Sequence, residues 1–143
     1  MAQPFVLECS VAMLWLHPDV NNPAAQRYAD SVLTSFADGT QAYVPGLWHL
    51  EVANVCLMLE KGRHETFQRV MQFLHDVGKL PISVDPKTHL YVFDRVISVA
   101  RQYELTAYDA AYLELAIRKN CPIATNDKKL KKAAQLTVGL LSV

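Results

Sequence analysis

Short apolar runs alternate along the chain with longer segments in which apolar residues recur every three or four positions. The apolar runs predict strands at residues 5–7, 42–44, 82–84, 123–125 and 138–141. The segments between them predict helices at residues 11–16, 21–36, 47–60, 64–77, 85–103, 106–119 and 128–134. Strands that alternate with helices in this way pair in parallel. We therefore expect an α/β fold with a central parallel sheet and helices on both faces.

Several of the predicted helices have recognisable ends. Ser10 can cap the helix at 11–16, because a hydroxyl oxygen accepts a hydrogen bond from an N–H of the first turn. Gly62 fits the position just beyond the helix at 47–60, where a left-handed backbone is common. Thr106 and Asp109 match the S/T-x-x-D/E pattern of a capping box.

The composition indicates one globular domain. The chain has 143 residues, of which 51% are hydrophobic, enough for a sizeable core. No apolar run approaches the ~20 residues that span a bilayer, and the start of the chain lacks the basic region of a signal peptide. We therefore expect a cytoplasmic protein with no membrane contact. The three cysteines share no metal-ligand spacing and are expected to be small buried residues.

Charge changes this picture in one region only. The formal net charge is zero, so no global field attracts nucleic acid. Basic residues nevertheless crowd a late stretch of the sequence: Arg118, Lys119, Lys128, Lys129, Lys131 and Lys132. This stretch is either a solvated helix face or a rim that contacts phosphates around an acidic centre.

Four acidic residues are the candidates for chemistry. Glu8 and Asp127 end apolar runs, Glu51 lies in the helix after the second strand, and Asp109 lies in the first turn of a late helix. The carboxyl ends of parallel strands meet at one edge of the sheet, where ligands bind. Carboxylates that converge there repel one another unless a cation lies between them. Oxygen ligands suit Mg²⁺ or Mn²⁺, so we expect a metal site for phosphoryl transfer.

Each of the four acids also has a structural alternative. Asp109 and Asp127 stabilise helix N-termini, and Ser10 and Thr125 can act as helix caps. Glu8 can be a surface acid at a strand end. Glu51 lies in a helix that is apolar around nearly its whole circumference, which predicts a buried helix. A buried Glu51, with Asn54 on the same face, needs a metal ion, a substrate group or an ion pair as its partner.

Four segments together resemble the motifs of PIN-domain ribonucleases, in particular the VapC-type toxins of bacterial toxin–antitoxin pairs. They are residues 5–16 (FVLECSVAMLWL), 44–55 (VPGLWHLEVANV), 105–113 (LTAYDAAYL) and 123–130 (IATNDKKL). The resemblance covers essentially all of residues 1–143, in the family's order. It implies a single domain with a three-layer α/β/α fold around a central parallel sheet of about five strands.

The resemblance also implies an activity, a cofactor and partners. The activity is cleavage of RNA with Mg²⁺ or Mn²⁺. Glu8, Asp109 and Asp127 would hold the metal, and Glu51 would orient or deprotonate the attacking water. Contacts to the substrate, or hydrogen bonds that hold the metal-binding carboxylates in place, would come from Ser10, Asn54, Thr125, Lys128 and Lys129. The expected partners are an RNA substrate, a cognate antitoxin and a second copy of the chain in a homodimer.

The sequence departs from the family at its first acid, which is normally Asp and is Glu8 in this chain. The extra methylene displaces the carboxylate by about one bond length, whereas Mg²⁺ requires near-ideal octahedral geometry. A PIN-fold binding module with an impaired site is therefore the second hypothesis. A nucleotide-binding α/β domain is a third, and it is disfavoured because neither GxGxxG nor GxxxxGK[ST] occurs.

Two further expectations concern the surface. His49 lies two residues from Glu51, roughly on the opposite side of the helix, and is expected at the surface or an interface. Apolar residues of the early helices exceed what a small core requires, although core packing is expected for most of them: Trp15, Leu16, Phe67, Met71 and Leu74.

Overall fold

Four short parallel strands form the centre of the molecule. A computed structural model describes residues 2–143 and gives the strands β1 (Phe5–Leu7), β2 (Ala42–Val44), β3 (Ile82–Val84) and β4 (Ile123–Ala124) in the sheet order β3-β2-β1-β4. Val6 pairs with Tyr43 on one side and with Ile123 on the other. β1 is therefore an inner strand, and it lies beside β4 from the far end of the sequence.

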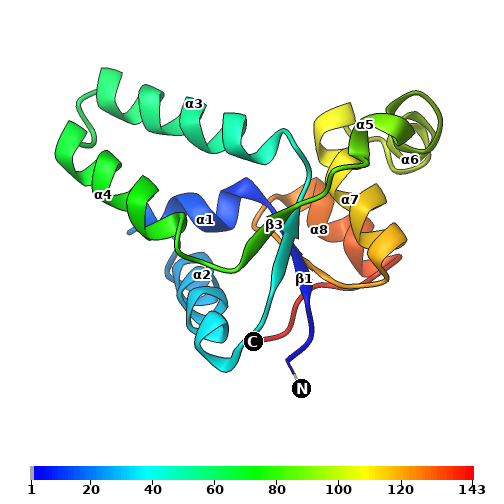
Figure 1. Cartoon of the computed structure of the whole chain (residues 1–143), viewed down its shortest axis with the longest axis horizontal. Helices are drawn as coiled ribbons and strands as arrows, with labels where there is room; N and C mark the ends of the chain where they lie inside the picture. Colours follow the sequence, from blue (N-terminus) through cyan, green and yellow to red (C-terminus); the bar gives the residue numbers. More distant parts are fainter. Residues whose placement is uncertain (1) are drawn as a thin grey trace.

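Helices cover both faces of this sheet (Figure 1). One layer consists of α1 (Cys9–Leu16), α2 (Pro23–Ser35), α3 (Trp48–Lys61) and α4 (Phe67–Val77), with the 3₁₀ turn η1 (Phe36–Asp38) after α2. The other consists of α5 (Thr88–Tyr91), the π-helical η2 (Val92–Val96), α6 (Ile97–Tyr103), α7 (Ala107–Lys119) and α8 (Lys128–Gln135). The expected α/β/α architecture is confirmed.

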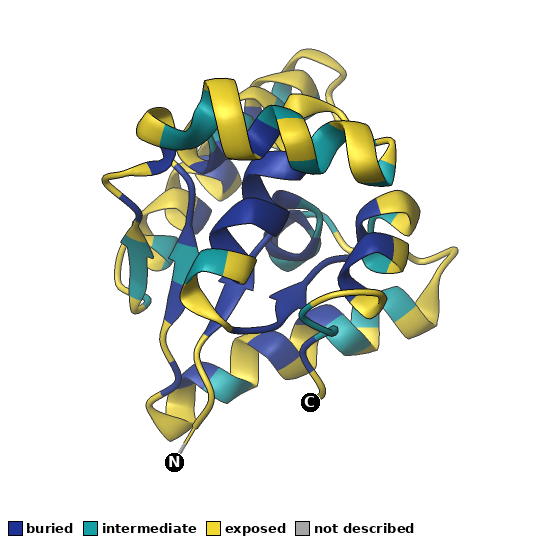
Figure 2. Ribbon diagram, turned by 90° about the vertical axis from the view of Figure 1, so that its right-hand side faces the viewer, coloured by how far each residue is buried: buried dark blue, intermediate teal, exposed yellow. Residues whose placement is uncertain are grey.

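The core lies between the sheet and the helices that pack on it (Figure 2). All three residues of β1 are fully buried, and α7 carries an unbroken buried run from Ala110 to Ala116. Parallel strands covered on both faces are apolar at every position rather than at alternate positions. This is why β1 is recognisable in the sequence as a continuous apolar run.

The expectation of about five strands is wrong, because the sheet has four. The segment 138–141 contributes only an isolated parallel bridge between Leu140 and Ile123. Gly139 takes a left-handed backbone with φ of 88° and ends the turn after α8, so only Leu140 is left to lie alongside β4. Two backbone hydrogen bonds, from Ile123 to Gly139 and from Leu141 to Ile123, complete the contact.

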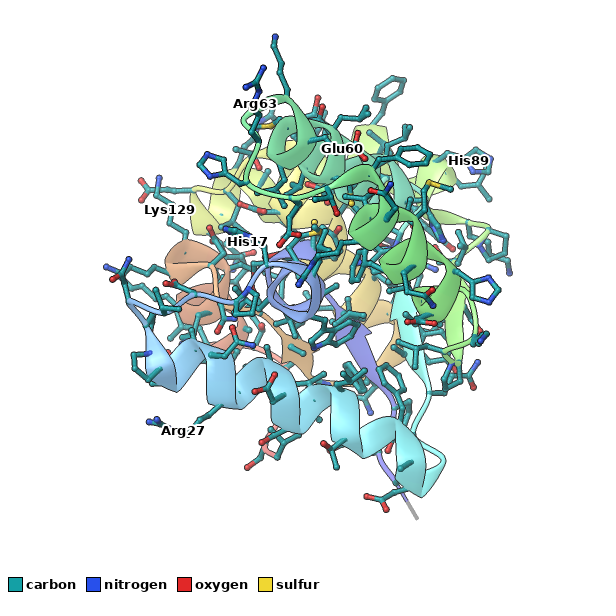
Figure 3. All side chains as sticks on the ribbon, turned by 90° about the vertical axis from the view of Figure 1, so that its left-hand side faces the viewer. His17, Arg27, Glu60, Arg63, His89 and Lys129 are labelled. Carbon is teal, nitrogen blue, oxygen red and sulfur yellow. The ribbon has the colours of Figure 1, made fainter. Side chains whose placement is uncertain are left out.

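The helix ends differ from the expectations at two places. α3 extends to Lys61, so Gly62 is its C-cap with an ordinary φ of −78°, and the left-handed position falls on Arg63 with φ of 58°. Arg63 projects outward from the turn after α3 (Figure 3). The helix expected at 85–103 starts at Thr88 and is interrupted by the π-helical segment η2.

α3 is not buried all round, in contrast to the expectation from its composition. Trp48, Val52 and Cys56 face the core, whereas Leu50 and Met58 are 75% and 63% exposed. The helix lies at the outside of its layer (Figure 1), so one side of it packs and the other has no covering element among residues 2–143. Phe67, Met71 and Leu74 of α4 are exposed too, while Leu16 is buried and Trp15 half-buried.

Candidate active site

Glu8 leaves β1 at its carboxyl end and caps the helix that follows. Its side chain accepts hydrogen bonds from the backbone N–H of Ser10 and from Thr125 Oγ1, the latter at 2.8 Å. The expectation that Ser10 is the cap is therefore wrong, because Glu8 is long enough to curl back to the first turn. Glu8 is only 6% exposed. Burial raises the pKa of its carboxyl, the two hydrogen bonds oppose the rise, and the charge of Asp109 adds to it.

Ser10 and Thr125 join the ends of β1 and β4. Ser10 Oγ accepts a hydrogen bond from the backbone N–H of Asn126 at 2.9 Å. The hydroxyl of Thr125 donates to Glu8 and accepts from the backbone N–H of Asp127 at 3.0 Å. Both side chains thus position the acids next to them. Their observed role is therefore structural, and contact with a substrate remains a prediction for both.

Glu51 lies in the first turn of α3 and is half-buried. The hydroxyl of Tyr112, on α7 in the opposite layer, donates a hydrogen bond to Glu51 Oε1. Burial raises the pKa of Glu51, the bond from Tyr112 lowers it, and the charge of Asp109 raises it further. Asn54 is exposed, and its amide lies 3.8 Å from Met58 Sδ, so it does not contribute to this cluster.

Asp109 lies in the first turn of α7, as expected. Thr106 caps the helix by accepting a hydrogen bond from the backbone N–H of Asp109 at 3.1 Å. Burial raises the pKa of the Asp109 carboxyl, and the charge of Asp127 adds to this rise. Thr106 and the charge of Lys129 act in the opposite direction. The charge of Asp109 thus raises the pKa of Glu8 and of Glu51, and its own pKa is raised by the charge of Asp127.

Asp127 is the N-cap of α8. Its Oδ1 accepts a hydrogen bond from the backbone N–H of Leu130 at 2.9 Å. The capping alternative considered from the sequence is thus correct for Asp127. It does not exclude a second role, because the other carboxylate oxygen remains available to a ligand.

The donor chemistry of the cluster fits a hard divalent cation, but the four side chains do not converge on a single position. Within residues 2–143, none of Glu8, Glu51, Asp109 and Asp127 forms an ion pair with a basic side chain. Uncompensated carboxylates at one site favour an added cation. Over the same residues, no three His, Cys, Asp or Glu side chains are grouped as ligands of a metal ion. Binding therefore requires side-chain rotation, above all of Glu8, whose two oxygens are both hydrogen-bonded.

The basic stretch divides into two parts with different surroundings. Arg118 points into the protein, where it pairs with Asp85 and Glu114. Lys119 lies over the ring of Tyr43, with its ammonium nitrogen 4.8 Å from the ring centre. The lysines of α8 are different, because none of them forms an ion pair in the described part of the chain. Lys128 and Lys129 are exposed beside Asp127, which fits both a solvated helix face and a rim that contacts phosphates.

Tyr112 is the residue of the site that the sequence reasoning did not identify. It is fully buried and lies three residues after Asp109, which places both on one face of α7. That spacing is the signal by which it could have been found. Two smaller expectations are met: His49 is exposed, and all three cysteines are free and buried. No helix among residues 2–143 is both long and apolar enough to cross a membrane.

Comparisons with known proteins place this arrangement in a family. The family model described as "PIN domain" matches residues 6–136. The crystal structure of PAE2754 from Pyrobaculum aerophilum is similar with a TM-score of 0.65 and 19% identity, over 99% of this chain and 91% of that one. The crystal structure of VapBC2 from Rickettsia felis, bound to a DNA fragment from their promoter, is similar with a TM-score of 0.61 and 14% identity, over 97% of each chain. No curated protein matches the sequence.

Proposed function

The chain belongs to the PIN domain family, and from this premise we propose that it is a Mg²⁺- or Mn²⁺-dependent endoribonuclease and the toxin of a type II toxin–antitoxin pair. PIN domains are in general metal-dependent nucleases, so hydrolysis of phosphodiester bonds follows from the family. The choice of RNA, of the two metals and of a VapC-type role is the proposal. That role is proposed from the resemblance of the four sequence motifs, and the similarity to VapBC2, at 14% identity, shows the fold alone.

The observation that carries the proposal is that four carboxylates lie near one edge of the sheet, close enough for their charges to act on one another. Thr125 links Glu8 to Asp127, Tyr112 holds Glu51, and Asp109 interacts electrostatically with all three other acids. Burial of several uncompensated acids lowers the free energy of unfolding, so such a group is unusual without a function. A group of this kind is expected where a cation and a phosphate are to be bound.

Each residue then has a defined part in hydrolysis. Glu8, Asp109 and Asp127 would hold the cation. When bound, it would neutralise charge that develops on the phosphate oxygens and make an attacking water more acidic. Glu51 would orient that water and accept its proton. Its pKa is raised toward neutral pH, which suits a general base. The charge of Lys129 lowers the pKa of Asp109, and its ammonium group would bind a phosphate of the RNA.

A groove between α1, α2 and α4 fits the expected antitoxin. It has a volume of about 310 Å³, and its lining is mostly apolar: Trp15, Leu16, Leu33, Phe73, Val77 and Leu80. Three polar residues, Arg69, Gln72 and Asp76, line it as well. An amphipathic segment of a small partner would bury its apolar residues there. We expect the product of the neighbouring small reading frame to co-purify with the chain and to block its RNA cleavage. Absence of both effects would remove the antitoxin from the proposal.

A homodimer is the second assembly that we propose. The exposed apolar residues of α3 supply its interface: Leu50, Leu57 and Met58. Large apolar side chains grouped on one helix face are typical of contacts between proteins.

The alternative function is a PIN-fold binding module without catalysis, and one observation favours it. Both carboxylate oxygens of Glu8 are engaged within the protein, by Ser10 and Thr125. If these bonds persist, Glu8 does not bind a metal and the site is incomplete. RNA would then bind to Lys128 and Lys129 at the start of α8 without being cut.

RNA cleavage tests the two functions against each other. Purified protein is incubated with single-stranded RNA in Mg²⁺, in Mn²⁺ and in EDTA. We expect cleavage that needs a divalent ion and is lost in both Asp109→Asn and Asp127→Asn. Asp76→Asn, at an exposed acid on α4, serves as the matched control and should cleave normally. Cleavage that survives both site substitutions comes from a contaminant or another site, and no cleavage in either metal supports the binding module.

A further inference from the structure

A second groove adjoins the acidic centre on the side of α8. It lies between the end of α6 and α8, and its volume is about 340 Å³. One wall carries Gln102, Tyr103 and Glu104, and the other carries Lys129, Lys132 and Leu136. We call it the α6–α8 groove.

Lys129 connects this groove to the carboxylates. It lines the groove, and its charge acts on Asp109. It lies at the edge of the molecule (Figure 3), where a long ligand can pass. A chain that enters the acidic centre and continues past Lys129 therefore enters the α6–α8 groove next.

The spacing of the lysines on α8 separates two faces of the helix. Lys129 and Lys132 are three residues apart, so they share a face, about 5 Å apart along the helix axis. Both line the groove, whereas Lys128 and Lys131 do not. Three charged residues line the groove, Lys129, Lys132 and Glu104, and their net charge is +1.

We infer that the α6–α8 groove binds the RNA strand on one side of the bond that is cut, with Lys132 contacting a phosphate beyond the reach of the catalytic carboxylates. This inference rests on the proposed function and extends it, because it assigns substrate binding to Lys132 and Gln102. Ammonium and amide donors suit phosphate oxygens. The half-buried Tyr103 adds an aromatic wall of the kind on which bases stack.

Glu104 is the one groove residue that opposes an anion. It is the C-cap of α6, with a left-handed backbone at φ of 55°, and it lines the groove. Its carboxylate would weaken binding of a phosphate, and its removal should strengthen binding. The groove thus offers substitutions that act in opposite directions.

Binding of RNA without cleavage provides the test. A labelled single-stranded RNA of about ten nucleotides, within the range that such sites cover, is titrated in EDTA and followed by fluorescence anisotropy at several salt concentrations. We expect Lys132→Ala to weaken binding roughly fivefold and to reduce the slope of log K against log salt by about 0.7, as for one lost phosphate contact. Glu104→Gln should tighten binding by about twofold.

Lys131→Ala is the matched control, because it removes the same charge from the same helix outside the groove. It should change the dissociation constant less than about twofold. Alanine favours helix, so both variants should keep the melting temperature of the parent protein. Equal effects of Lys132→Ala and Lys131→Ala on affinity and salt slope would overturn the inference.

Two further outcomes separate this inference from the proposed function. Binding that depends on Lys132, in a protein that cuts no RNA in Mg²⁺ or Mn²⁺, supports the groove and removes the nuclease. Normal metal-dependent cleavage, with equal RNA affinity of the two lysine variants, supports the nuclease and removes the groove. If Lys132→Ala abolishes binding of a polyglutamate peptide and leaves RNA binding unchanged, the groove binds an acidic protein segment and the RNA inference is wrong.

Discussion

Arg118 holds Asp85 through both terminal nitrogens of its guanidinium group, at 3.0 and 2.8 Å. The same guanidinium donates to Glu114 at 2.7 Å and lies 4.6 Å from the centre of the Tyr91 ring. Asp85 directly follows β3, whereas Arg118 belongs to the helix that carries Asp109. The pair therefore fixes the edge of the sheet to the helix of the candidate active site.

This pair predicts an acid-sensitive contribution to stability. Burial alone would raise the pKa of Asp85, but hydrogen bonds from Arg118 and Thr88 outweigh it and lower the pKa to about 2. The folded value lies below the ordinary 3.8, so the ionised group stabilises the fold above pH 3.8 and loses that effect as the pH falls to about 2. The contribution is about 2 kcal/mol.

Asp85→Asn should therefore lower the free energy of unfolding by about 2 kcal/mol more at pH 7 than at pH 2. Urea titrations at the two pH values measure this difference. Asp76→Asn removes an exposed acid that is bonded only to Gln72, and it should leave the difference near zero. The same loss for Asp85→Asn at both pH values would contradict the assigned role of the ion pair.

Tyr112→Phe tests the hydroxyl that holds Glu51. We expect RNA cleavage to fall roughly tenfold, because partners of this kind orient catalytic carboxylates. The free energy of unfolding should fall by about 1 kcal/mol. Tyr28→Phe is the control, because it removes a partly buried hydroxyl that donates to the Leu141 carbonyl at 2.9 Å, away from the acids. Equal loss of cleavage in both variants would mean that Tyr112 acts on stability alone.

Glu8→Asp tests the departure from the family at the first acid. Aspartate is a good N-cap, so α1 should keep its cap. The shorter side chain should withdraw from Thr125 and leave an oxygen for a cation. We expect affinity for Mn²⁺ to rise about tenfold, which calorimetry measures directly. A decrease would instead identify Glu8 as an adapted ligand, and no change would place it outside the metal site.

Substitution on α3 tests the homodimer. Light scattering of the parent chain should give twice the monomer mass. Met58→Glu should give a monomer, because it places a charge in an apolar interface. Val20 is an apolar residue that is 85% exposed elsewhere on the surface, and Val20→Glu should leave the dimer intact. A parent chain that is monomeric at high micromolar concentration would remove the homodimer.

The order of elements and the four acids could be predicted because both depend on local signals. Buried strands such as β1 are continuous apolar runs, Asp109 lies in the first turn of α7, and Asp127 is the N-cap of α8. The partners of the acids could not be predicted, because they depend on distant segments. Glu8 meets Thr125 only through the pairing of β1 with β4, and Glu51 meets Tyr112 only across the sheet edge.

The exposure of α3 could not be predicted for a different reason. An apolar circumference indicates burial of the whole helix but does not say what buries it. Within residues 2–143, the protein supplies a covering surface for Trp48 and Val52 and none for Leu50 or Met58. The partner in the proposed homodimer would cover this outer face.

The pairing of β1 with β4 sets an order of events during synthesis. Glu8 and Thr125 are 117 positions apart, and Asp127 follows them. A ribosome adds about 5–20 residues each second, so the amino-terminal acid is made many seconds before its neighbours exist. An emerging chain that ends before residue 125 carries Glu8 and Glu51 but has no closed acidic cluster. The proposed nuclease would therefore lack its complete set of acids until nearly all of its own sequence has been read.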